Sequence, residues 1–167
     1  GYICTSPFPY DGIFRRAVLN FKFHNCGAYA ELLSHEMVRS IKDVYRDREF
    51  DLVTCVPMHK DTLRKRGYNQ AELLAKECAR LLGIEYADLL AKTKKNKTQH
   101  SIKAAERAKN VIGVYSPIDK NLIKGKRILI IDDIITTGST LGECAKILNK
   151  CKCGEICCCT LCTSLLI

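Results

Sequence analysis

The chain has 167 residues, which is long enough for one domain with a hydrophobic core of its own. Hydrophobic residues make up 47% and charged residues 27%, an ordinary globular composition, and no apolar run approaches the ~20 residues that a membrane-spanning helix needs. The net charge of +9 favours anionic partners, such as phosphorylated metabolites, nucleic acid or an anionic surface.

The N-terminal region predicts an extended start followed by two helices. Residues 1–10 are rich in proline and are expected to lie extended over the surface. Asp11 is a suitable N-cap for a first helix, which residues 22–25 end. From residue 28 to about residue 46 apolar side chains recur at helical spacing and predict a second helix.

A strand, a basic loop and a helix follow in that order. Residues 51–56 predict a strand that Pro57 ends, and the basic loop at 57–68 is about a dozen residues long. Loops of that length inside compact domains are usually functional. Asn69 fits the N-cap of a helix that runs to residue 82, with Glu72 completing a capping box. The pattern is typical of an α/β unit.

The next segment is less regular and strongly basic. Between residues 92 and 109, seven basic residues stand against the single Glu106. For the run 92–97 taken alone, a solvated surface is the favoured interpretation. The elements expected here are a weak strand at 86–91, a mobile polar run at 92–101, a short helix at 102–108 and an extended piece at 111–115.

Residues 128–140 (ILIIDDIITTGST) carry the strongest functional signal. The apolar run predicts a strand buried on both faces, and a helix is expected at about 139–149. Backbone N–H groups of Thr136, Thr137, Gly138, Ser139 and Thr140 can surround a phosphate at this helix N-terminus, because Gly138 permits positive φ. Asp132 and Asp133, expected where the strand ends, suit the hydroxyls of a ribose 5-phosphate.

Cysteines gather near the C-terminus, where six of the 11 fall within residues 151–162. Their spacing fits neither a secreted disulfide scaffold nor the paired CxxC knuckles of a structural zinc site. Residues 155–162 instead predict a buried strand in which cysteine serves as a small hydrophobe. Metal or redox chemistry is the alternative. Free thiols imply a reducing, cytoplasmic setting.

Residues 128–140 closely resemble the phosphoribosyl pyrophosphate (PRPP) signature of type I phosphoribosyltransferases. Further segments resemble the ComF family, which is linked to natural competence, and together they cover nearly the whole chain in the family's order. These segments are Tyr10–Lys22, Val53–Met58, the RGYNQA element at 66–71, and Gln99–Asn110.

The resemblance implies an α/β fold of the type I phosphoribosyltransferase class, in which helices flank a mostly parallel central sheet. It implies a single domain over residues 1–167, with a small helical hood at 1–45 and a PRPP-binding core at 50–167. In relatives a zinc-binding cysteine module precedes this domain. Only Cys4 precedes Cys26 here, so the sequence shows no such module, and it begins at Gly1. Either the module was cut away or this member lacks it.

The resemblance also assigns roles to residues. The loop after the first strand would hold pyrophosphate through the backbone of Met58, His59 and Lys60, with charge from Arg64 and Arg66, although a basic surface turn is the alternative. Segment 92–110 resembles a lid that closes over PRPP, with Lys103 and Arg107 reaching the diphosphate. Mg²⁺ is expected as the cofactor, held mainly by PRPP and also by Asp132 or Asp133, which are further candidates for acid–base catalysis.

Three functions remain open at this stage. The first is a phosphoribosyltransferase that transfers ribose 5-phosphate from PRPP to an unidentified nucleobase or amine and releases pyrophosphate. The second is a catalytically silent PRPP- or nucleotide-binding partner of competence or DNA-processing proteins. Direct nucleic-acid binding through residues 92–109 is the weakest, because that run lacks interleaved aromatic residues for base stacking. A homodimer is also consistent with the resemblance.

Overall fold

A mostly parallel sheet forms the centre of the computed structural model, which describes residues 2–23, 27–94 and 112–165. The strand order is β1-β8-β7-β3-β4, and β2 also pairs with β8. All of these pairings are parallel. The strands are β1 (Ile3–Thr5), β2 (Phe8–Pro9), β3 (Leu52–Cys55), β4 (Glu85–Tyr86), β7 (Arg127–Ile135) and β8 (Glu155–Thr163).

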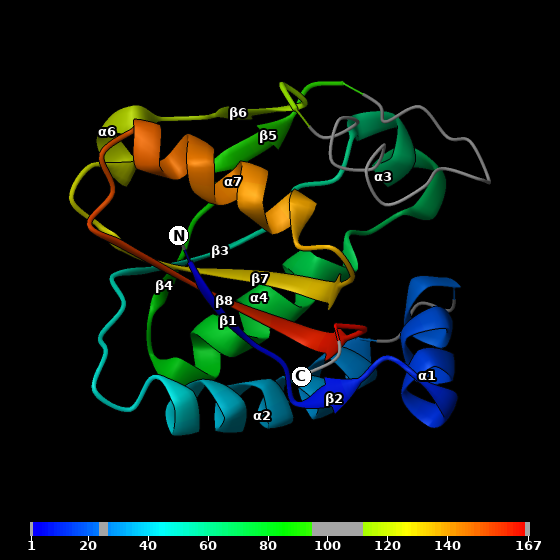
Figure 1. The fold of residues 1–167 in the computed structure, drawn as a ribbon. Helices are drawn as coiled ribbons and strands as arrows, with labels where there is room; N and C mark the ends of the chain where they lie inside the picture. The colour runs from blue at the N-terminus through cyan, green and yellow to red at the C-terminus, as the bar shows by residue number, and fades with distance from the viewer. Residues whose placement is uncertain (1, 24–26, 95–111, 166–167) are drawn as a thin grey trace.

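Two layers cover the sheet (Figure 1). The first consists of α2 (Gly27–Val44) and α4 (Gln70–Leu82), which pack against each other and against the strands. The second consists of α7 (Ser139–Lys150), the short α6 (Lys120–Ile123) and an antiparallel hairpin of β5 (Leu90–Lys92) and β6 (Tyr115–Pro117). Helix α1 (Gly12–Phe23) stands at the side of the sheet. The α/β class expected from the sequence is confirmed.

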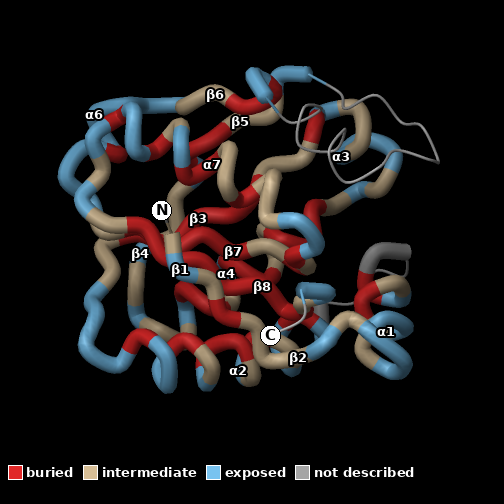
Figure 2. The backbone as a smooth tube through the Cα atoms, in the orientation of Figure 1, coloured by how far each residue is buried: buried red, intermediate tan, exposed pale blue. Residues whose placement is uncertain are grey.

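Strand β7 is buried on both faces, as its apolar run predicts. Leu129 and Ile131 belong to the core on the α2 and α4 side, while Ile128 and Ile130 belong to the core under α7. All four are 0% exposed. Figure 2 shows buried backbone through the middle strands and exposed stretches along the outer helices. Two separate cores therefore meet at this strand, because successive strand residues point to opposite faces.

The cysteine-rich strand β8 is buried in the same way. Cys157 and Cys159 face α2 and α4, whereas Cys158 faces the α7 side. Burial raises the pKa of the Cys158 and Cys159 thiols well above the usual range. Within the described part of the chain all ten cysteines are free, and no group of three or more side chains could hold a metal ion. The prediction that cysteine acts here as a small hydrophobe is confirmed.

The N-terminal segment is more deeply integrated than the sequence suggests. Residues 1–10 were expected on the surface, but β1 and β2 pair in parallel with β8. Pairing satisfies the backbone groups of a strand that would otherwise be an open edge. Helix α2 also packs against β8 and contributes Met37 and Ile41 to the core. The region expected as a helical hood thus supplies an edge strand and a core helix.

The middle of the chain differs from the prediction at three places. Most of the basic loop is the helix α3 (Lys60–Arg66), which is capped by His59 and by Gly67 in the left-handed region, with φ of 89°. The strand expected at 86–91 is divided between β4 and β5, which lie in different sheets. The extended piece expected at 111–115 begins at Tyr115.

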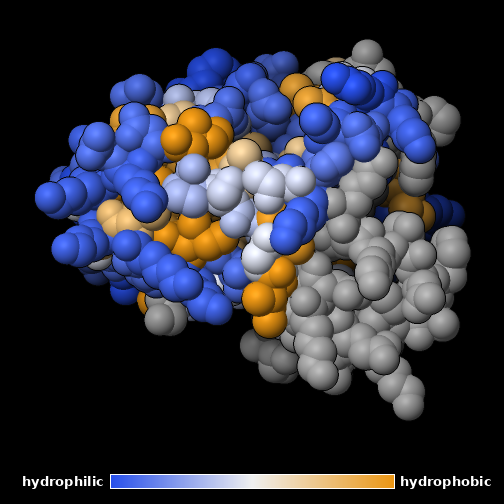
Figure 3. Space-filling model, turned by 90° about the horizontal axis from the view of Figure 1, so that it is seen from above, coloured by the Kyte–Doolittle hydropathy of each residue, from blue (hydrophilic) through white to orange (hydrophobic). Residues whose placement is uncertain are grey.

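The expectations for 95–111, including the short helix at 102–108, fall outside the described residues. The surface seen from the side of α7 and β6 is mainly hydrophilic, with separate apolar patches (Figure 3). Among the described helices, none combines the length and apolar character that crossing a membrane requires.

Replacing Cys158 by serine tests its role as a hydrophobe. We expect Cys158→Ser to lower the free energy of unfolding by about 1–3 kcal/mol, because a hydroxyl would be buried where the thiol is 0% exposed. The half-buried Cys153 is the matched control, and Cys153→Ser should change stability by less than about 0.5 kcal/mol. Urea unfolding measures both. Equal losses in the two variants would contradict this interpretation.

Candidate functional site

The candidate site lies at the carboxyl ends of β3 and β7, which are neighbours in the sheet. Open parallel sheets bind their ligands at this edge, because the loops that leave adjacent strands meet there. One wall comes from the turn between β7 and α7. Another comes from the segment between β3 and α4, which includes α3.

The turn after β7 has the geometry of a phosphate cradle. Thr136, Thr137, Gly138, Ser139 and Thr140 together line one small hollow of about 30 Å³, with Asp132 at its side. Gly138 has φ of 75° and is the N-cap of α7, a twelve-residue helix whose positive dipole end points into the turn. The Ser139 N–H lies 3.3 Å from Thr137 Oγ1. The turn residues predicted from the sequence therefore come together around one site.

The two acids do not share one environment. Strand β7 continues to Ile135, so Asp132 and Asp133 lie within it and not after it. Because consecutive strand residues alternate, the two side chains leave β7 on opposite faces of the sheet. Asp133 is only 5% exposed, whereas Asp132 is half-buried and lines the phosphate hollow. The backbone N–H of Asp133 donates to Asp132 Oδ1 at 2.9 Å.

Asp133 is held by a hydrogen-bond relay from α3. Gln70 Nε2 donates to Asp133 Oδ2 at 2.9 Å, and Arg66 Nη1 donates to Gln70 Oε1 at 2.9 Å. Gln70 is itself 6% exposed. Since a guanidinium can only donate, the Gln70 oxygen must face Arg66 and its NH₂ group must face the carboxylate. Sequence reasoning missed this role for Gln70, although the residue lies within the RGYNQA element.

Asp132 interacts electrostatically with Lys92, a cation that was expected on a solvated surface. Lys92, at the end of β5, is half-buried, and its Nζ lies 5.6 Å from the centre of the Tyr115 ring. Burial lowers the pKa of Lys92, and the nearby negative charge of Asp132 opposes that effect. The solvated interpretation is therefore wrong for Lys92, because the pairing of β5 with β6 sets it beside Tyr115 in the same layer as α7.

The segment after β3 lines a larger cleft of about 510 Å³. Met58, His59 and Lys60 all contribute to its wall, as do Lys92 and Asp88. His59 Nδ1 accepts from the Asp61 backbone N–H at 3.2 Å and thereby caps α3. Of the two arginines predicted to add charge, Arg64 is exposed and does not line this cleft, and Arg66 is engaged with Gln70.

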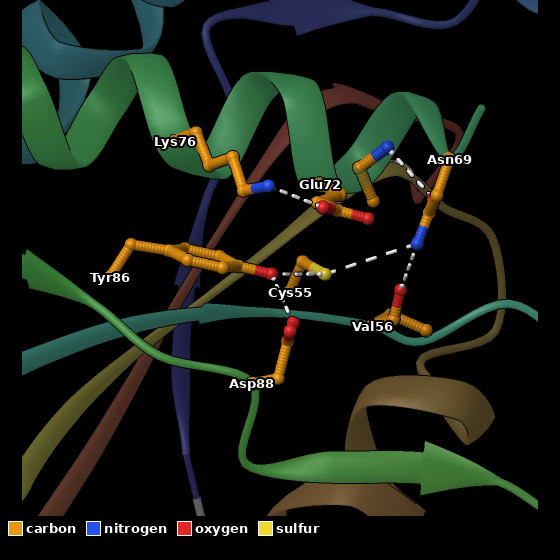
Figure 4. A network of polar contacts seen from close by, with 8 residues as sticks. Cys55, Val56, Asn69, Glu72, Lys76, Tyr86 and Asp88 are labelled. Carbon is orange, nitrogen blue, oxygen red and sulfur yellow. Dashed lines mark hydrogen bonds and ion pairs between the residues drawn. The ribbon is translucent and has the colours of Figure 1, made fainter.

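A polar network fixes the inner wall of the cleft (Figure 4). Asn69 Nδ2 donates to the Val56 carbonyl at 3.1 Å, and Asn69 Oδ1 accepts from the Ala71 N–H, so the predicted N-cap also holds the end of β3. The Tyr86 hydroxyl donates to Asp88 Oδ1 at 2.6 Å. Glu72, predicted as part of a capping box, pairs with Lys76 at 2.5 Å.

Of the two acids, Asp132 is the one that a metal ion could reach, because Asp133 is buried against Gln70. Mg²⁺ prefers one or two carboxylates combined with substrate phosphates over a site built from protein alone. A half-buried carboxylate beside a phosphate cradle fits that preference. The expectation that PRPP itself would hold most of the metal is therefore compatible with these residues. Lys103 and Arg107, the predicted lid residues, lie outside the described part of the chain.

Comparison with known proteins gives concordant results. Residues 69–165 match the family model of the phosphoribosyl transferase domain. Competence protein F of Haemophilus influenzae is 32% identical over 83% of this chain and 63% of that protein. Competence protein ComFC of Bacillus subtilis is 30% identical over 90% of this chain and 60% of that protein. The chain thus spans less than two thirds of the length of either relative.

Solved structures agree at the level of the fold. Glutamine PRPP amidotransferase from B. subtilis superimposes with a TM-score of 0.51 at 22% identity, covering 77% of this chain and 25% of that one. PRPP synthetase from Mycobacterium smegmatis gives a TM-score of 0.50 at 17% identity, covering 80% of this chain and 34% of that one.

A parallel sheet covered on both faces, with a hollow at a helix N-terminus after one strand and a basic segment after its neighbour, defines a domain of the type I phosphoribosyltransferase class. The family model matches residues 69–165 of 167, and the chain belongs to the phosphoribosyl transferase domain family. The predicted resemblance to ComF proteins is confirmed by the two competence proteins.

Removing the Gln70 amide tests the relay to Asp133. We expect Gln70→Met to lower the free energy of unfolding by about 1–3 kcal/mol, because the buried carboxylate loses a hydrogen-bond donor. Lys76→Met, which breaks an exposed ion pair on the same helix, is the control and should cost less than about 1 kcal/mol. Urea unfolding at neutral pH measures both, and equal stability of Gln70→Met and the unchanged protein would contradict the relay.

Proposed function

We propose that this chain is a Mg²⁺-dependent phosphoribosyltransferase, which transfers ribose 5-phosphate from PRPP to a nucleobase or amine and releases pyrophosphate. The observation that carries the proposal is the phosphate cradle at 136–140, beside Asp132 and next to the cleft of Met58, His59 and Lys60. One hollow suits the 5-phosphate of PRPP and the other its diphosphate. Family membership supports the same assignment.

The different environments of the two acids suggest a division of roles. Asp132 is half-buried at the hollow, so it is the better placed acid to accept hydrogen bonds from the ribose hydroxyls. Asp133 would keep the relay to Gln70 and Arg66 in place. Asp133 would then influence the substrate only indirectly, through the relay of Gln70 and Arg66. Lys92 would add positive charge to the cleft, since it lines that cleft and interacts electrostatically with Asp132.

The reaction requires little covalent chemistry from the protein. The bond from C1 of the ribose to the pyrophosphate oxygen breaks, and pyrophosphate keeps the electron pair. The acceptor nitrogen bonds to C1 and gives up its proton to the departing pyrophosphate or to solvent. Positioning and electrostatic stabilisation therefore account for most of the catalysis. When bound, Mg²⁺ supplies charge neutralisation at the diphosphate. Lys103 and Arg107 remain predicted contributors on the lid.

The names of the relatives favour a second candidate. Two similar proteins are called competence proteins, and the DNA utilization protein YhgH of Escherichia coli is 30% identical over 60% of this chain. These names concern DNA uptake and use and no transferase reaction. A PRPP-binding partner of DNA-processing proteins in the cytoplasm, without turnover, is therefore the alternative proposal.

Calorimetry with PRPP and Mg²⁺ tests binding. We expect saturable binding that weakens at least about tenfold in the double variant Asp132→Asn/Asp133→Asn, because hydrogen bonds to charged groups contribute about 1.5–3 kcal/mol each. Asp47→Asn is the control, since this exposed carboxylate lies in the loop before β3, at the opposite edge of the sheet. If the unchanged protein fails to bind PRPP, both the enzyme and the silent partner are excluded.

Pyrophosphate release separates the two candidates. Incubation with PRPP, Mg²⁺ and a panel of nucleobases, ammonia and simple amines should release pyrophosphate with at least one acceptor. The variants of the binding experiment are used again. Asp132→Asn/Asp133→Asn should abolish pyrophosphate release, whereas Asp47→Asn should retain it. PRPP binding without release for any acceptor would favour the silent partner.

A further inference from the structure

The phosphate cradle is supported from the far N-terminus of the chain. The Tyr2 hydroxyl donates to the carbonyl of Gly138 at 2.9 Å, across 136 positions in sequence. Its ring also lies against α7, because a Cβ added at Gly142 would meet Tyr2 at 3.8 Å. Tyr2 immediately precedes β1, which parallel pairing with β8 fixes at the edge of the sheet. The contact therefore joins the sheet edge to the turn that follows β7.

The contact acts on the peptide unit that presents a donor to the hollow. The Gly138 carbonyl accepts from both Tyr2 and the Gly142 N–H, at 2.9 and 2.8 Å, which uses both of its lone pairs. A trans peptide is planar, so its C=O and the following N–H point in opposite directions. Holding the Gly138 carbonyl thus directs the Ser139 N–H to the other side, where it donates to Thr137 Oγ1 at 3.3 Å.

Two further observations indicate that the Tyr2 hydroxyl packs closely against Gly138 and stays protonated. A Cβ at Gly138 would lie 3.0 Å from the Tyr2 hydroxyl, so a side chain there would push against the tyrosine in addition to straining a φ of 75°. Burial, with smaller contributions from neighbouring thiols, raises the pKa of Tyr2 to about 12. The phenol therefore stays protonated at neutral pH and remains a hydrogen-bond donor.

We propose that Tyr2 is a positioning residue for the phosphate cradle, which orients the Gly138–Ser139 peptide so that its N–H faces the 5-phosphate of the ligand. The inference rests on the proposed function, because it assumes that the cradle binds the ribose phosphate. It adds a residue outside the motif at 128–140, and it couples the position of the N-terminal strand to phosphate affinity.

Tyr2→Phe tests the proposal by removing one hydroxyl while leaving the ring. Three probes are titrated by calorimetry, namely PRPP with Mg²⁺, ribose 5-phosphate alone and pyrophosphate with Mg²⁺. We expect affinity for PRPP and for ribose 5-phosphate to fall by the same factor, about three- to tenfold, as the loss of one neutral hydrogen bond predicts. Affinity for pyrophosphate should not change, because its cleft is lined by other segments.

Tyr45→Phe is the matched control. The Tyr45 hydroxyl lies 3.0 Å from the Ile3 carbonyl and 2.8 Å from the Cys158 carbonyl, so it stabilises the same β1–β8 edge without contacting the turn. Tyr45→Phe should lower the urea midpoint and leave all three affinities unchanged. Tyr2→Phe should show the opposite pattern, with lower phosphate affinity and a smaller change in midpoint. A residue that only stabilised the fold would not produce this separation.

The outcomes are distinct. Equal PRPP affinity in Tyr2→Phe and the unchanged protein would overturn the proposal while leaving the proposed function intact. A parallel loss of pyrophosphate affinity would overturn it too, since that pattern indicates general loosening. If the unchanged protein binds neither PRPP nor ribose 5-phosphate, the proposed function itself fails, and the positioning role fails with it.

Discussion

The burial of β7 on both faces is the constraint on which the rest of the structure depends. The strand pairs with β3 on one side and β8 on the other, and its apolar side chains alternate between two cores. An alternating strand cannot direct two successive side chains the same way. Asp132 and Asp133 therefore diverge, although they are adjacent in sequence. The side chain of each acid therefore contacts a different layer of the domain.

This divergence connects the site to both layers. Asp133 depends on the junction of α3 and α4 through Gln70 and Arg66, whereas Asp132 faces the hairpin and α7. Burying a carboxylate is costly unless hydrogen bonds compensate it. The Gln70 relay meets that requirement with a neutral amide, which bonds to the acid on one side and to Arg66 on the other. A ligand at this edge would touch elements from both sides of the sheet.

Local patterns in the sequence were sufficient for the elements that are regular and buried. The sequence pattern predicted the apolar run of β7, the N-cap of α4 at Asn69 and its end at residue 82, and the cysteine-rich strand β8. Features that depend on residues far away in the sequence were not predicted. β1 is a strand only because β8 offers an open edge, and Lys92 is half-buried only because β6 folds back over it. Gln70 lies in the RGYNQA element, but nothing in the sequence indicated its bond to Asp133, which lies 63 positions away.

The turn at 136–140, which we propose as a phosphate cradle, shows the same limit at the level of chemistry. Its donors are backbone N–H groups, which every residue except proline possesses, so their presence in a sequence carries no information. What makes them a site is orientation, set by the positive φ of Gly138, by the start of α7 and by hydrogen bonds to the adjoining carbonyls. The residue that orients such an N–H group can therefore lie anywhere in the chain. Tyr2, before the first strand, is the tyrosine that reaches the Gly138 carbonyl here.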